Sequence, residues 1–158
     1  ANIVPETAVV HYNVRYENDK QSTLVAQTVD FLVKRINKCD GLNAQLHGSF
    51  TALPKHVGPG SKALQQLVEQ SAADLGLPQV TWRDTGGVCD GNRTAALGLP
   101  TIDTLGVRGG AIHSDLEFME VDSLAQRAKL SALLLMKLAS GAADWPTRDA
   151  HGARSVSE

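Results

Sequence analysis

The sequence is poor in the residues that build disulfide-rich or cysteine-rich metal modules. Only two cysteines occur among 158 residues, so a disulfide framework is excluded. Cys39 and Cys89 lie far apart and have no metal-type spacing. The two cysteines therefore favour free thiols in a reducing, cytoplasmic compartment.

The sequence also lacks long apolar runs and an excess of either charge. No stretch reaches about 18 consecutive apolar residues, so we expect no membrane-spanning helix. The 15 basic and 17 acidic residues leave a formal net charge of −2, which gives no electrostatic reason to expect nucleic acid or a membrane as partner. The N-terminal residues have no apolar signal core and run directly into a strand pattern, as in a chain that begins within a larger protein.

The common ligand-binding motifs are missing as well. The chain contains no G-x-G-x-x-G fingerprint and no phosphate loop. It also has no H-E-x-x-H metal motif, and zinc requires three or four ligands. The stretch "GGAIHSD" places a lone His113 behind two glycines, and spacing alone favours a solvated loop histidine over a metal ligand.

The N-terminal third has the periodicity of a small α+β lobe. Residues 7–16 alternate between apolar and polar, which predicts a half-buried strand. Helical spacing follows up to Ile36, with Ser22 as the expected N-cap. Residues 43–50 alternate again, so we expect strand, helix and strand within residues 1–54.

The rest of the chain predicts part of an α/β layered domain over residues 55–142. The segment "PKHVGPG" is the expected boundary, because proline and glycine are dense there. Amphipathic spacing predicts a helix capped by Ser61 and ended by Gly76, and a strongly apolar helix opened by a Ser123–Gln126 capping box and buried between other layers. The intervening elements are expected to be a strand at 79–83, a short helix from Asp90 to Leu97 and a strand at 101–105, and the tail at 143–158 is expected to be disordered.

Three further positions could carry chemistry. The turn at Gly86 and Gly87 precedes a helix, where backbone N–H groups can bind an anion, although such a turn is more often only a turn. Arg15 could clamp a carboxylate through its guanidinium, but the pattern alone favours a solvated sheet face. Cys89 could be a nucleophile near a helix start, with a buried inert thiol as the favoured alternative.

Two stretches resemble the dinuclear-zinc carboxypeptidase, aminoacylase and deacetylase family, and most closely its glutamate carboxypeptidase-like members. They are "ANIVPETAVVHYNVRY" and "DTGGVCDGNRTAALGLPTIDTLGVRGGAIHSDLEFMEVDSLAQRAKLSALLL", and the resemblance spans about residues 2–140. It implies a zinc-exopeptidase-like α/β catalytic domain with two zinc ions and a ferredoxin-like lid that forms a homodimer. On this template residues 1–54 are the second half of the lid, and residues 55–142 are the C-terminal part of the catalytic domain.

The resemblance also implies roles for individual residues. His113 matches a zinc ligand, and Arg15 matches a lid arginine that grips the substrate's carboxylate. Gly86 and Gly87 match a loop that lines the same pocket, and Asp90 matches a helix cap that braces it. The family's other metal ligands and its general base lie upstream of the matching stretches, so we expect no catalytic base here and an N-terminal half outside this chain.

The function implied is zinc-dependent hydrolysis of an amide bond next to a free carboxylate, in a peptide or an N-acyl amino acid. Peptidase and deacylase activities stay equally open. Two alternatives remain for the chain by itself. It could be an inactive structural or dimerisation module, or a non-metal domain that binds carboxylates through Arg15 and the glycine turn.

Overall fold

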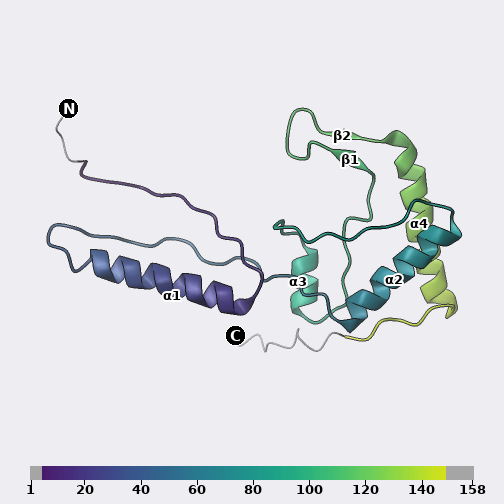
Figure 1. Cartoon of the computed structure of the whole chain (residues 1–158), viewed down its shortest axis with the longest axis horizontal. Helices are drawn as coiled ribbons and strands as arrows, with labels where there is room; N and C mark the ends of the chain where they lie inside the picture. The colour runs from purple at the N-terminus through teal and green to yellow at the C-terminus, as the bar shows by residue number, and fades with distance from the viewer. Residues whose placement is uncertain (1–4, 149–158) are drawn as a thin grey trace. The chain divides into compact units, whose positions relative to one another are not determined.

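The computed structural model describes residues 5–148 and divides the chain into two compact units, Ala1–Phe50 and Thr51–Glu158. The first unit contains one helix, α1 (Asp19–Ile36). The second contains, in chain order, α2 (Pro59–Asp74), α3 (Gly91–Ala96), β1 (Gly109–Gly110), β2 (Phe118–Met119) and α4 (Val121–Ser140) (Figure 1).

Helix α1 confirms the helical prediction but begins earlier than expected. Its N-cap is Asn18, whose side-chain oxygen accepts a hydrogen bond from the backbone N–H of Gln21 at 3.1 Å. The Ser22 hydroxyl instead donates to the carbonyl of Asp19 at 2.9 Å, inside the first turn. The prediction of Ser22 as N-cap is therefore wrong, because Asn18 already satisfies the first free N–H groups.

The extended segments of the first unit do not form the two predicted strands. Residues 7–16 and 43–50 run without a backbone ladder, because no neighbouring strand is present among the described residues to receive their hydrogen bonds. The predicted alternation survives locally, since Val14 and Tyr16 are half-buried whereas Arg15 is exposed. The rings of Tyr16 and Phe50 meet edge to face, with their centroids 4.9 Å apart.

No described residue of the first unit is fully buried. Helix α1 has a half-buried stripe of Val25, Val29 and Val33, which follows helical spacing. Other large apolar side chains are exposed, including Val10 at 79% and Phe31. This unit therefore presents an apolar surface, and burial within the unit contributes little to its stability.

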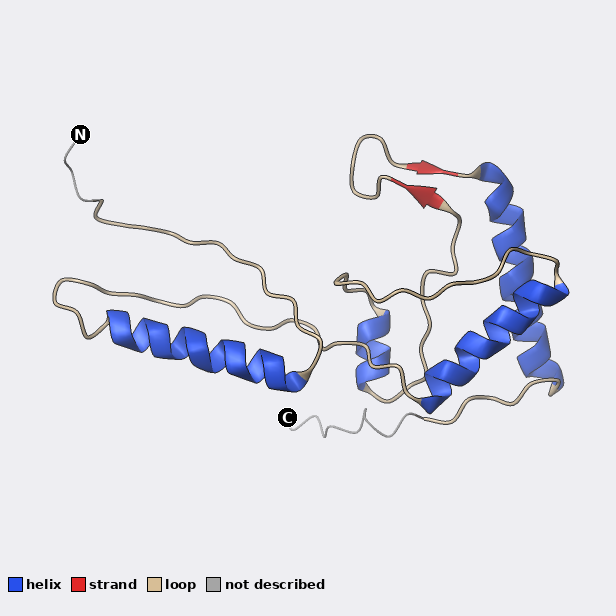
Figure 2. Ribbon diagram, viewed as in Figure 1, coloured by secondary structure: helices blue, strands red, loops and turns tan. Residues whose placement is uncertain are grey.

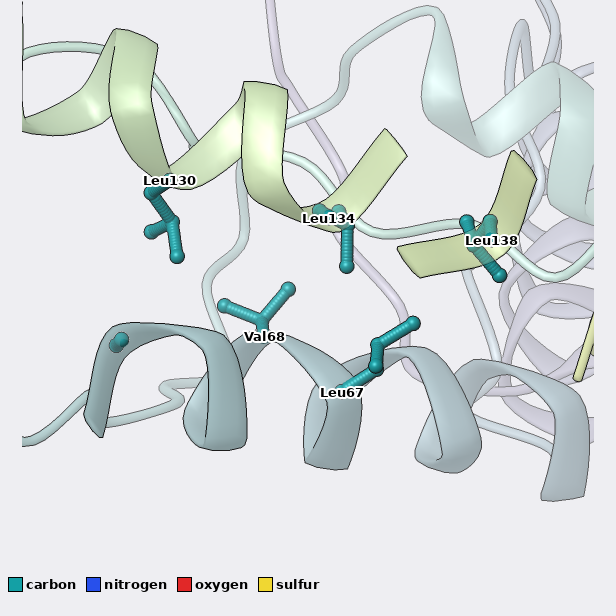
Figure 3. Packing of buried hydrophobic residues seen from close by; sticks show 6 residues of the cluster. Leu67, Val68, Leu130, Leu134 and Leu138 are labelled. Atoms are coloured by element: carbon teal, nitrogen blue, oxygen red, sulfur yellow. The ribbon is translucent and has the colours of Figure 1, made fainter. Parts of the chain in front are cut away.

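The core of the second unit lies between α2 and α4. Figure 3 shows Leu67 and Val68 of α2 facing three leucines of α4, and Ala72 completes the buried set. The α4 leucines are Leu130, Leu134 and Leu138, which recur every four residues on one stripe. The opposite face of α4 is exposed at Leu135 and Met136, so the prediction of a helix buried between two layers is wrong.

Helix α2 starts at a different residue from the one predicted, but it ends where predicted. It begins at Pro59 after Gly58, and proline is well suited to a first helical position. Ser61 is buried inside the first turn, where its hydroxyl accepts from the backbone N–H of Thr101 at 3.2 Å, so it is not the cap. Gly76 has φ +63° and ends the helix, as predicted.

Among residues 5–148 the only sheet is the antiparallel pair β1–β2, two residues on each side (Figure 2). The predicted strands at 79–83 and 101–105 are irregular segments, because the described residues offer them no partner strand. The architecture is a mixture of helices with a small sheet, and it is compatible with part of an α/β peptidase domain. None of the described helices is long and apolar enough to cross a membrane.

The predicted tail is only partly described. Ala143 packs against the core formed by α2 and α4, and its backbone N–H donates to the carbonyl of Lys137 at 3.1 Å. Residues 149–158 of the predicted disordered segment lie outside the described residues.

Candidate functional site

The β1–β2 hairpin explains why two glycines precede His113. A Cβ atom on Gly109 would lie 2.1 Å from the carbonyl oxygen of Phe118, a distance that no side chain tolerates. A Cβ atom on Gly110 would lie 2.9 Å from the Phe118 ring. Gly109 therefore cannot be replaced without moving the backbone of β2, whereas a side chain at position 110 would displace the Phe118 ring.

His113 lies in the loop that joins the two strands. Its backbone is left-handed, with φ +67°, and Ala111 is left-handed as well, with φ +53°. The Ser114 hydroxyl closes this turn, since it donates to the carbonyl of Ala111 at 2.7 Å and accepts from the N–H of Leu116 at 3.2 Å. Left-handed backbone is uncommon for residues other than glycine, and such local strain clusters at functional sites. The loop leaves the imidazole exposed to solvent.

Arg108 fastens the base of this hairpin to α4. Its backbone N–H donates to the Ser123 hydroxyl at 2.9 Å, and its guanidinium donates to Glu120 at 2.7 Å and to Gln126 at 2.8 Å. The predicted capping box is therefore wrong. The N-cap position is Glu120, and Ser123 and Gln126 bind Arg108 instead.

The glycine turn at Gly86 and Gly87 is exposed, and neither residue has a left-handed backbone. The N–H of Gly87 donates to the hydroxyl of Thr85 at 3.4 Å. Asp90 occupies the N-cap position of α3, as predicted, but its side chain makes no capping hydrogen bond. The turn therefore leads into α3, and no side-chain carboxylate caps the first N–H groups of this helix.

Cys89 is exposed, so the favoured prediction of a buried thiol is wrong. Its thiol donates to the Oδ2 atom of Asp103 at 3.0 Å, and the ammonium of Lys55 donates to the same oxygen. The Cys89 and Lys55 hydrogen bonds lower the pKa of Asp103 below its ordinary value. Asp103 is therefore ionised at neutral pH beside the thiol.

Asn92 is the most buried polar residue near the turn, with 6% of its surface exposed. Its side-chain oxygen accepts from the N–H of Cys89 at 3.1 Å, and its amide nitrogen donates to the carbonyl of Leu53 at 2.9 Å. Sequence reasoning missed this residue, and it missed Lys55 and Asp103 as well. Only distant segments bring these side chains together, so no spacing in the sequence indicates them.

Arg15 belongs to the first unit, whereas Gly86, Gly87 and His113 belong to the second. Its side chain is exposed, and within residues 5–148 the structure records no ion pair for it. A guanidinium without a protein carboxylate is available to a ligand's carboxylate. The joint action of Arg15 with the glycine turn and His113 remains a prediction.

The part of the chain that the structure describes does not fit a zinc centre by itself. No three His, Cys, Asp or Glu side chains gather there in a way that could hold a metal ion. A zinc site needs at least three protein ligands, and His113 supplies one. A hollow of about 310 Å³ beside α2, lined by Glu69, Leu77 and Val80 among others, includes none of the predicted site residues.

Comparison with known proteins gives distant similarity to hydrolases. The chain is 27% identical over 146 residues to carboxypeptidase G2 of Pseudomonas sp. (strain RS-16), covering 89% of the chain and 34% of that protein. It is 27% identical over 142 residues to succinyl-diaminopimelate desuccinylase of Psychrobacter arcticus, covering 87% of the chain and 33% of that protein. These relatives are hydrolases. The similarity supports the zinc-peptidase and aminoacylase family that the sequence motifs resemble.

The same comparisons show what share of each relative's length the chain covers. A desuccinylase of Buchnera aphidicola is also 27% identical, over 137 residues that make up 34% of its length. The chain thus spans about a third of the length of the curated relatives that it matches. No protein-family profile and no solved structure matches the chain.

Proposed function

We propose that this chain is the C-terminal part of a zinc-dependent hydrolase that cleaves an amide bond next to a free carboxylate. The observation that carries the proposal is the similarity to a carboxypeptidase and to desuccinylases over 87–89% of the chain. Peptides and N-acyl amino acids are the proposed substrates. The two free thiols support a reducing, cytoplasmic compartment as part of the same proposal.

The chain's own residues would bind and orient the substrate rather than move its protons. Arg15 and the turn at Gly86 and Gly87 would hold the carboxylate, and His113 would contribute one imidazole to a metal site that residues outside this chain complete. When bound, zinc would supply a polarised carbonyl and a water of lowered pKa. The isolated chain, lacking the other ligands and a general base, is proposed to be inactive.

A matched pair of substrates tests this function in the longer protein. We expect zinc-dependent hydrolysis of an N-acyl amino acid, and about tenfold to hundredfold lower kcat/KM for the corresponding amino-acid amide, because the amide cannot form a charged pair with Arg15. The measurement is kcat/KM for both substrates before and after chelation and after zinc is restored. Equal rates for acid and amide, or turnover that survives chelation, would contradict the proposal.

A second candidate function, dimerisation, is favoured by the exposed apolar surface of the first unit. Extended segments that pair with no strand among residues 5–148, together with large exposed apolar side chains, are typical of a surface that pairs with another chain. A second copy of this unit, paired as a lid-type dimer, is the proposed occupant. Val10 is 79% exposed there, and Leu116 of the second unit is equally exposed at 80%.

The two exposed residues give a test of dimerisation with an internal control. Val10→Lys should weaken self-association about tenfold or more, since a charge would be placed in an apolar contact, whereas Leu116→Lys should leave it unchanged. Sedimentation velocity over a concentration series measures both constants. A monomeric parent chain, or equal weakening by both variants, would exclude pairing through this surface.

A further inference from the structure

Three separate segments of the second unit meet at one carboxylate. Asp103 accepts from the ammonium of Lys55 and from the thiol of Cys89 through the same oxygen, Oδ2. The Lys55 and Asp103 side chains keep only 23% and 34% of their surface exposed. An ion pair that is partly shielded from water and shares its acceptor with a third group constrains geometry more than an exposed pair does.

The backbone of Cys89 is held by Asn92. The buried Asn92 side chain accepts from the N–H of Cys89 and donates to the carbonyl of Leu53. Both polar ends of this amide are therefore satisfied, as buried polar groups require. Asn92 thus holds Cys89 at its backbone, and the thiol of Cys89 donates to Asp103 at 3.0 Å and to Asn92 at 3.6 Å.

Packing around Gly91 leaves little room for this arrangement to shift. A Cβ atom there would lie 3.2 Å from the sulfur of Cys89, 3.2 Å from Cγ2 of Thr101 and 3.5 Å from Oδ2 of Asp103. The thiol and the carboxylate therefore enclose the space in which a side chain would stand. Only Val88 separates Cys89 from the glycine turn, so fixing Cys89 also restrains the end of that turn.

We propose that Asp103 is a positioning residue that holds the glycine turn at Gly86 and Gly87 in place through Cys89, with Lys55 bound to Asp103 and Asn92 bound to Cys89. This inference rests on the proposed function, in which the turn contacts the carboxylate of the substrate. Backbone N–H groups bind an anion well only when they are preorganised, and two exposed glycines do not hold themselves. A brace outside the two glycines holds the turn in position, and it consists of Lys55, Cys89, Asn92 and Asp103.

Alkylation of the two thiols tests the brace without reference to activity. In the 158-residue chain, Asp103→Asn should speed the reaction of Cys89 with N-ethylmaleimide about threefold to tenfold, because an amide accepts the thiol's hydrogen bond less strongly than a carboxylate and holds the thiol less tightly. Cys39, an exposed thiol of the first unit, should react at an unchanged rate. Mass spectrometry of the two cysteine peptides measures both rates.

Asp74→Asn is the matched control for this substitution. It breaks another Lys–Asp pair of the same unit, in which the ammonium of Lys137 lies 2.5 Å from Asp74, and it should change neither thiol. If Asp103→Asn leaves the Cys89 rate at the parent value, Asp103 does not hold the thiol and the proposal is wrong. The same holds if Asp74→Asn accelerates Cys89 equally.

A second pair of variants leaves the charged pair intact and reads out substrate binding. In the longer hydrolase, Cys89→Ala should raise KM for the carboxylate substrate about threefold to tenfold with kcat little changed, because only the thiol's hydrogen bond is lost. Cys89→Ser, whose hydroxyl can donate to Asp103, should restore KM. Suppose that Cys89→Ala keeps the parent KM although Asp103→Asn accelerates the alkylation of Cys89. The brace would then stand, but the proposed contact between the turn and the substrate would be wrong.

Discussion

Replacing His113 should remove zinc from the longer hydrolase and lower kcat/KM about a thousandfold or more. A metal site loses affinity when one of its three or four ligands is deleted, and the catalysis that depends on the metal is lost with it. Asparagine is the informative replacement, since it tolerates the left-handed backbone that His113 adopts at φ +67°. His113→Asn therefore removes the imidazole without adding backbone strain to the result.

Metal analysis by mass spectrometry, alongside kcat/KM, checks this expectation. His47→Asn is a suitable control, because His47 is an exposed histidine of the first unit that has no proposed role. We expect that variant to keep its zinc and its activity. A His113→Asn protein that retains the parent zinc content would show that His113 is a loop histidine, the alternative that spacing alone favours.

Replacing Arg15 by alanine should raise KM for carboxylate-bearing substrates about tenfold to a hundredfold. A hydrogen bond to a charged group contributes about 1.5–3 kcal/mol. Arg15 is exposed and forms no ion pair within residues 5–148, so its guanidinium is available to the substrate's carboxylate. Arg15→Lys should recover only part of this loss, because an ammonium cannot form the two parallel hydrogen bonds of a guanidinium. Steady-state kinetics with the acid and amide substrates measure the difference.

The control for Arg15 is Arg35, an exposed arginine in the last turn of α1. Arg35→Ala removes the same charge from the same unit and should leave KM for both substrates unchanged. If Arg15→Ala raises KM for the amide as much as for the acid, the residue acts on the fold rather than on the carboxylate.

The helices were the predictable part of this fold. Apolar spacing gives the stripes of α1, α2 and α4 directly, because each buried or half-buried side chain recurs at every third or fourth position. The starts were less predictable. At Ser22, Ser61 and Ser123 a hydroxyl with cap chemistry finds another partner, and a local pattern cannot rank those competing hydrogen bonds.

The strands could not be predicted in the same way. Alternation in residues 7–16 indicates a segment suited to a sheet, but a strand forms only where a second backbone pairs with it. That partner is a long-range feature which no window of sequence contains. The one strand pairing within residues 5–148, Gly109 with Met119 and Gly110 with Phe118, joins segments that a short loop keeps together.

The candidate site likewise has one feature with a local signal in the sequence and one without. The two glycines before His113 stand out in the sequence, but only the structure gives a reason for them, the close approach of Phe118 to Gly109. The brace had no local signal, since Lys55 and Asp103 stand 48 positions apart. Their contact depends on how the segments around α2 and α3 pack.

The close contact at Gly109 also sets limits for protein engineering. Loop positions beyond His113, such as Asp115 and Leu116, have exposed side chains, so libraries that vary them would sample many amino acids at little cost to folding. A library that includes position 109 would instead return almost exclusively glycine, since even a methyl group would displace the neighbouring strand. Libraries built on this hairpin should therefore vary Asp115 and Leu116 and leave His113 and the stem unchanged.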